Sequence, residues 1–240
     1  MNRKNLLTAA AFALMAVVGL AHESSAGTIS VTGSTGAGHV AGVDGFAGVL
    51  SNGGFNIDVF AGTVYAKITD PAGTPYTLNQ EFQTYCVDLG AGVTVPGTYA
   101  LTTDSMSNWN LGGSAPVDGE QAAYLYNTYA GVVSTADQRA GLQLAIWEVL
   151  RDTTFNLTSG NLSVVSGFSA GAIAYANTIG ASVGQAKAVW LKLGAGTNRT
   201  DAQDFIGPTP VPEPASLLLL GSGLAAAAWG ARRKKNAARS

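Results

Sequence analysis

The only cysteine of the 240-residue chain, Cys86, lies in a segment (residues 81–89) that has the composition of a β-strand. A thiolate is a nucleophile, so this residue could form a covalent bond. A single thiol cannot make an internal disulfide. In an oxidising compartment it therefore implies an intermolecular bridge, a free thiol or another covalent fate.

A second unusual residue is Gln143, which lies in the middle of an apolar helix face. Residues 135–151 have helical periodicity, and Glu148 and Asp152 are expected on the opposite side. The apolar residues of the face are Leu142, Ile146, Trp147, Val149 and Leu150. A buried primary amide costs about 1–3 kcal/mol if it is left unpaired, so Gln143 must meet a partner in the core.

These two segments resemble the thioester domains of bacterial surface adhesins. Tyr85-Cys86-Val87 on a strand is followed 57 residues later by Gln143-Leu-Ala-Ile-Trp147 on a helix. The resemblance covers about residues 50–195. It implies an internal thioester in which Cys86 is the thiol and Gln143 is the acyl donor.

The supporting residues of the motif are Tyr85, Ala145 and Trp147. Leu142 departs from it, because the family usually has threonine there, and this leaves activation of the bond open. The alternative is an inert form of the same fold. In that form Gln143 is a hydrogen-bonded core amide and Cys86 a small buried hydrophobe.

An enzyme is a weaker alternative. Once the N-terminal signal described below is removed, His39 is the only histidine, and no acid is evident to orient it for a Cys-His hydrolase. Four aspartates are scattered without ligand spacing, namely Asp44, Asp58, Asp88 and Asp104. We predict no enzymatic activity, no metal site and no cofactor.

The elements that must position Cys86 and Gln143 indicate an α+β fold. Alternation predicts strands at 55–60 and 64–68, joined as a hairpin, and further strands at 81–89 and 98–103. Capping sequences predict helices over 118–129 and 135–151. A strand at 162–165, a helix at 170–179 and a strand at 188–193 follow. We expect a β-sandwich or barrel with a helical insertion, spanning residues 27–207.

The N-terminus is typical of a cleavable signal peptide over residues 1–26. Basic residues precede an apolar run at 6–20, and Ser24-Ser25-Ala26 fits signal peptidase. We expect the mature chain to begin at Gly27. Cleavage after Ala21, or an uncleaved helix, are the alternatives.

The C-terminus combines a Pro-rich linker at 208–214, an uncharged apolar segment at 215–231 and a basic tail at 232–240. The apolar segment would reach about 25 Å as a helix, enough for a single transmembrane helix through a thin bilayer. The positive-inside rule then leaves both basic ends in the cytoplasm and the domain between them outside.

The order of these C-terminal features resembles the PEP-CTERM sorting signal of Gram-negative bacteria. The motif residues are Val211, Pro212, Glu213 and Pro214. The resemblance implies recognition by an exosortase, cleavage at or near the motif, and an association with exopolysaccharide production. Before processing, the tail would hold a periplasmic domain at the inner membrane, and afterwards the domain would reach the cell surface or matrix. A plain C-terminal anchor is the alternative.

The net charge of the expected exported domain limits which partners it can bind. Residues 27–212 hold six basic and thirteen acidic side chains, a net charge of −7, which argues against nucleic acid. We expect a surface adhesin whose partners are signal peptidase, the exosortase and a surface amine or polysaccharide ligand. The competing prediction is a structural exopolysaccharide or biofilm matrix protein without a reactive bond.

Overall fold

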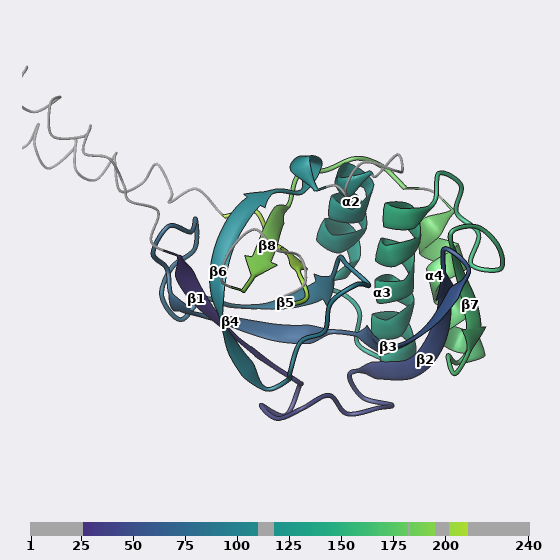
Figure 1. Cartoon of the computed structure of the whole chain (residues 1–240), viewed down its shortest axis with the longest axis horizontal. Coiled ribbons are helices and arrows are strands. Elements are labelled where there is room, and N and C mark those ends of the chain that lie inside the picture. Colours follow the sequence, from purple (N-terminus) through teal and green to yellow (C-terminus); the bar gives the residue numbers. More distant parts are fainter. Residues whose placement is uncertain (1–25, 110–117, 182, 195–201, 211–240) are drawn as a thin grey trace, which may run out of the picture. The chain divides into compact units, whose positions relative to one another are not determined.

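Six strands close into an antiparallel barrel in the computed structural model, which describes residues 26–109, 118–181, 183–194 and 202–210 (Figure 1). They are β1 (Gly27–Thr32), β4 (Val64–Asp70), β5 (Glu81–Cys86), β6 (Gly97–Ser105), β8 (Val189–Leu193) and β9 (Phe205–Gly207). Their order around the barrel is β1-β4-β5-β9-β8-β6. In β1 every second residue is buried, including Ile29 and Val31, because alternate side chains face the barrel interior. The barrel confirms the predicted α+β class.

A separate three-stranded sheet has the order β3-β2-β7, built from β2 (Gly45–Asn52), β3 (Phe55–Gly62) and β7 (Leu162–Ser166). The predicted hairpin between residues 55–60 and 64–68 is wrong, because β3 pairs with β2 whereas β4 pairs with β1 and β5. Only Thr63 separates β3 from β4, and the shortest common hairpin loops need two residues. The chain therefore passes from one sheet into the other at this point.

The helices are inserted between β6 and β8, which are neighbours in the barrel. A short 3-10 helix (Met106–Asn108) is followed by α2 (Gly119–Tyr129), α3 (Ala136–Arg151) and α4 (Ala170–Gly180). The side chain of Asp118 caps α2, and Thr135 and Gln138 form a complete capping box at the start of α3. The predicted helical insertion is confirmed, with both capping residues in place.

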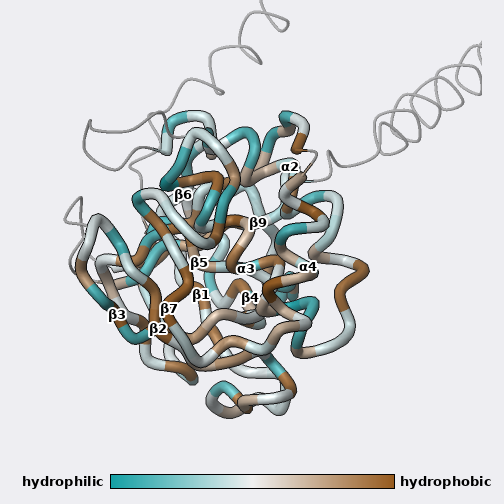
Figure 2. The backbone as a smooth tube through the Cα atoms, turned by 90° about the vertical axis from the view of Figure 1, so that its right-hand side faces the viewer, coloured by the Kyte–Doolittle hydropathy of each residue, from teal (hydrophilic) through white to brown (hydrophobic). Residues whose placement is uncertain are grey.

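Helix α3 occupies the interior of the domain. It contacts α2, α4, β2, β3, β5 and β7, and every residue from Ala140 to Leu150 is buried. In both views α3 lies among the other elements (Figures 1 and 2). A Cβ atom at Gly141 would lie 2.6 Å from the carbonyl oxygen of Ala172, so glycine allows α4 to approach. Over these residues α3 has no solvent-facing side.

The prediction that Glu148 points away from the core is wrong, because a second layer of elements covers that side of α3. Glu148 is fully buried, and its Oε1 accepts a hydrogen bond from the backbone N–H of Asn156 at 2.7 Å. Burial raises the pKa of Glu148 to about 7. Asp152 remains half-buried, and its carboxylate accepts hydrogen bonds from the N–H groups of Asn161 and Leu162 at the start of β7.

The raised pKa of Glu148 predicts that stability falls as the pH rises from about 5 to about 8. The folded state retains a proton in the window between the ordinary pKa of glutamate and about 7, so each step through that window favours unfolding. Glu148→Gln keeps an acceptor for Asn156 but cannot ionise. Urea unfolding at several pH values should show that the free energy of unfolding falls less with pH in the variant than in the wild type. An equal fall in both proteins would contradict the prediction.

Candidate functional site

The end of β5 leaves two buried backbone groups without a strand partner. The last pair between β4 and β5 is Val64 with Thr84, whereas β9 follows the other edge of β5 as far as Cys86. Backbone groups of successive strand residues face alternate edges, and the N–H of Val87 donates to Asp204 on the β9 side. The N–H and C=O of Cys86 therefore face the edge at which β4 no longer pairs.

The side chain of Gln143 fills this gap. Its Oε1 accepts a hydrogen bond from the N–H of Cys86 at 2.8 Å, and its Nε2 donates one to the C=O of Cys86, also at 2.8 Å. Gln143 is fully buried. Its amide thus takes the place of a strand residue, and the fold brings together the two residues that the sequence singled out.

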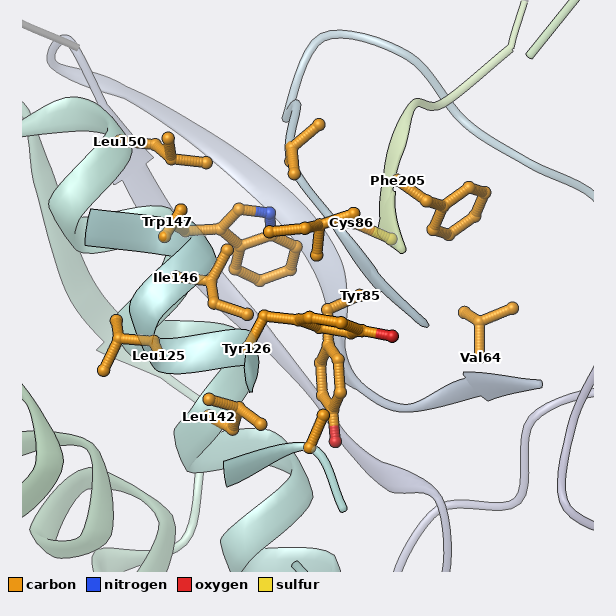
Figure 3. Close-up of a cluster of buried hydrophobic side chains, with 14 of the residues drawn as sticks. Val64, Tyr85, Cys86, Leu125, Tyr126, Leu142, Ile146, Trp147, Leu150 and Phe205 are labelled. Atoms are coloured by element: carbon orange, nitrogen blue, oxygen red, sulfur yellow. The ribbon is translucent and has the colours of Figure 1, made fainter. Parts of the chain in front are cut away.

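The other motif residues are also buried in the core. Tyr85 is fully buried, its phenol shares a 2.6 Å hydrogen bond with Thr63, and burial raises its pKa. Trp147 and Cys86 belong to one buried cluster (Figure 3). Ala145 and Leu142 are also fully buried, and Leu142 offers no hydroxyl group to the site. All of the motif residues are thus core residues, and Trp147 and Cys86 also line one cavity.

A cavity of about 220 Å³ opens beside Cys86. Its wall includes Trp147 from α3, Asp58 from β3 and Gln203, which precedes β9. The indole Nε1 of Trp147 is buried and has no hydrogen-bond partner among the described residues. The cavity gives a small molecule a route to the otherwise buried Cys86.

His39 lines the same cavity, although no sequence pattern placed it there. Its ring stacks on Phe60 with 4.3 Å between the ring centroids. Burial lowers the pKa of His39, and the nearby carboxylate of Asp44 opposes this only in part, so the imidazole is neutral at pH 7. The one available signal was that His39 is the only histidine of the expected mature chain.

The thiol of Cys86 is held in its neutral form. Burial, and secondarily the charge of Asp88, raise its pKa well above the ordinary value. The pKa of Asp88 is itself raised to about 7, chiefly by burial. A protonated thiol reacts slowly with oxidants, so the raised pKa protects this lone cysteine even without a covalent bond.

Other predicted sites lie at the edge of the described residues or outside them. Gly27, the expected first residue of the mature chain, begins β1, while Val211–Pro214 and the apolar segment 215–231 are not described. Within the described part of the chain, no helix is long and apolar enough to span a bilayer. The same residues contain no cluster of three or more histidine, cysteine or acidic side chains arranged to hold a metal.

Removing the amide of Gln143 should cost more stability than removing the sulfur of Cys86. Gln143→Leu leaves a buried N–H and a buried C=O unpaired, at about 1–3 kcal/mol each. Cys86→Ala keeps both hydrogen bonds and should cost about 1 kcal/mol through lost packing. Any covalent link is lost in both variants, so the difference isolates the hydrogen bonds. Urea unfolding that ranks the two variants equally would show that the hydrogen bonds contribute little.

One protein-family model matches the chain, the PEP-CTERM protein-sorting motif over residues 210–234. Comparisons with curated proteins and with solved structures found no match. The matched segment contains the Val211–Pro214 motif, the apolar segment that follows it and the first three residues of the basic tail, 232–234. The chain is thus an exported protein that carries a PEP-CTERM signal, is recognised by an exosortase, and is processed and anchored at the cell envelope.

Proposed function

We propose that the exported domain is an adhesin with an internal thioester between Cys86 and Gln143. The observation that supports it is the pair of 2.8 Å hydrogen bonds that holds the carboxamide of Gln143 against the backbone of Cys86 in a fully buried place. This pairing keeps the amide of Gln143 next to Cys86 and away from bulk water, and both conditions are needed for such a bond. The Tyr85, Ala145 and Trp147 motif positions add the resemblance to adhesin thioester domains.

The bond would form with the loss of ammonia. The sulfur of Cys86 attacks Cδ of Gln143, the Cδ–Nε2 bond breaks, and the thiol proton leaves with the departing nitrogen as NH3. The N–H of Cys86 already donates to Oε1, where negative charge develops in the tetrahedral intermediate. The backbone of Cys86 thus supplies an oxyanion donor for its own acylation.

Transfer to a partner would use the same donor. A primary amine that enters the cavity attacks the thioester carbon, the C–S bond breaks, and an amide forms as the thiol regains a proton. Trp147 and the neighbouring apolar residues Leu89 and Val93 line this route and limit the access of water. We propose a surface amine as the acceptor, and hence a binding rather than an enzymatic role.

A structural matrix protein without a reactive bond is the second candidate. One observation favours it: both polar atoms of the Gln143 amide are already paired with the backbone of Cys86. Loss of Nε2 would leave the C=O of Cys86 without its donor, so the fold stabilises the unreacted amide. Leu142, in the place of the usual threonine, also favours a protein without a reactive bond.

Export and anchoring complete the proposal. Signal peptidase would cut before Gly27, and the segment 215–231 would hold a periplasmic domain at the inner membrane until the exosortase acts. The PEP-CTERM match supports the second step. The domain then reaches the cell surface or the extracellular matrix.

Intact mass spectrometry of the exported protein tests the thioester. Condensation should make it lighter than its processed sequence by one ammonia, about 17 Da. Methylamine should add its own mass and release a titratable thiol. Cys86→Ala and Gln143→Glu should show no deficit, and Leu142→Thr should form the bond at least as completely as the wild type. A full calculated mass with a free Cys86 in fresh protein would support the matrix protein instead.

The sorting signal predicts that Glu213→Ala blocks processing. The substitution removes the only charged residue of the Pro-Glu-Pro motif, so a larger species should remain with the cells in a host that has an exosortase. Glu120→Ala, in the first turn of α2, is the matched control and should be processed normally. Immunoblots of cell and extracellular fractions measure both. Wild-type protein that retains Ser240 in such a host would rule out processing at this signal.

A further inference from the structure

A cleft of about 430 Å³ lies on the outer face of the barrel, over β1, β4 and β5. It is lined by Ser30, Thr32, Gly33, Ser34, Gly36, Tyr65, Ala66, Lys67, Glu81, Phe82 and Gln83. Two rows of paired residues cross the three strands beneath it. One row is Thr32, Tyr65 and Gln83, and the other is Ser30, Lys67 and Glu81. Side chains from three strands thus converge on one site.

The hydrogen-bonding groups of the cleft are uncommitted. The side-chain hydroxyls of Ser30, Thr32, Ser34 and Tyr65 make no hydrogen bond with any part of the chain that the structure describes. The Oε1 atom of Gln83 is buried and likewise has no partner there. The four hydroxyls line the cleft and are free to pair with a ligand, and the side-chain amide of Gln83 lines the same cleft.

The charge of the cleft is balanced. Lys67 and Glu81 are its only charged lining residues, and they pair with each other at 3.2 Å. The surrounding domain has a net charge of −7 and repels anions. A phosphate or a uronic acid is therefore disfavoured, and no unpaired carboxylate in the cleft attracts a cation. These groups suit an uncharged ligand with many hydroxyl groups.

The wall of the cleft is preformed. Asp44 is fully buried, and its carboxylate accepts hydrogen bonds from the N–H groups of Ser34 at 3.1 Å and Val40 at 2.8 Å. The N–H of Gly33 also donates to the C=O of Ala37 at 2.6 Å. These bonds fix the loop after β1, so a ligand would not have to order it on binding.

We propose that this cleft binds sugar units of a neutral polysaccharide. Each sugar presents hydroxyl donors and acceptors that match the uncommitted groups of Ser30, Thr32, Ser34 and Gln83. The ring of Tyr65 offers an apolar surface for the C–H face of the sugar and a phenol for its hydroxyls. The site does not depend on the thioester, because none of its residues belongs to the Cys86 site.

Affinity electrophoresis tests this binding with the processed protein from its host. Native gels would contain dextran, galactomannan, hydroxyethyl cellulose or, as an anionic polymer, alginate. At least one neutral polymer should retard the wild type, and alginate should not. Gln83→Leu should weaken the apparent affinity about five- to ten-fold, as expected for one lost hydrogen bond. Tyr65→Phe should weaken it in the same direction.

The matched control is Tyr124→Phe, which removes a phenol from α2 outside the cleft and should bind as the wild type does. Cys86→Ala should also bind normally, so this result stands whether or not the thioester forms. Circular dichroism would confirm that each variant is folded. The proposal fails if no neutral polymer retards the wild type, if alginate retards it more strongly, or if folded Gln83→Leu and Tyr65→Phe bind like the control.

Discussion

Two hydrogen bonds between a side-chain amide and a strand backbone connect the helical layer to the barrel. They are needed because the last pair between β4 and β5 joins Val64 to Thr84, and β5 continues for two more residues to Cys86. That early stop has a cause in the chain path, since the residues just before Val64 belong to the other sheet. Gln143 of α3 closes the resulting gap. The position of α3 is therefore tied to the point at which the two sheets diverge.

The same arrangement has different consequences for the two candidate functions. As an inert fold, it satisfies every polar atom of the Gln143 amide at no further cost. In a thioester, the carbonyl oxygen of residue 143 would still accept the hydrogen bond from the N–H of Cys86. The hydrogen bond to the C=O of Cys86 would be lost, at a cost of about 1 kcal/mol or more, and a covalent bond would form instead. A hydrogen bond that stabilises the amide ground state also aligns the carbonyl for attack. The packing around Gln143 therefore does not distinguish the inert fold from the thioester.

Sequence patterns predicted the local helices and strands well, but predicted strand pairing and burial less well. Capping residues such as Thr135 and alternation along β4 act over a few neighbours, so the helices and strands of this kind could be predicted, whereas β2 and β9 were not. Pairing depends on distant segments, and the predicted hairpin of residues 55–60 and 64–68 was therefore wrong. Helical periodicity identifies an apolar face but not a second covering layer, which is why Glu148 was misplaced. His39 reaches the Cys86 cavity through a loop that has no periodic signal at all.

Alternation along β4 and β5 separates the two proposed sites. Tyr65 and Gln83 line the cleft, whereas Val64 and Cys86 line the cavity. Residues one or three positions apart in a strand point to opposite faces, so the two sites lie on opposite sides of the same strands. A sugar bound in the cleft therefore cannot present its hydroxyl groups to Gln143 of the same molecule. Reversible glycan binding and amine acylation thus use separate sites, so one molecule has room to hold a polymer at one site and a second surface at the other.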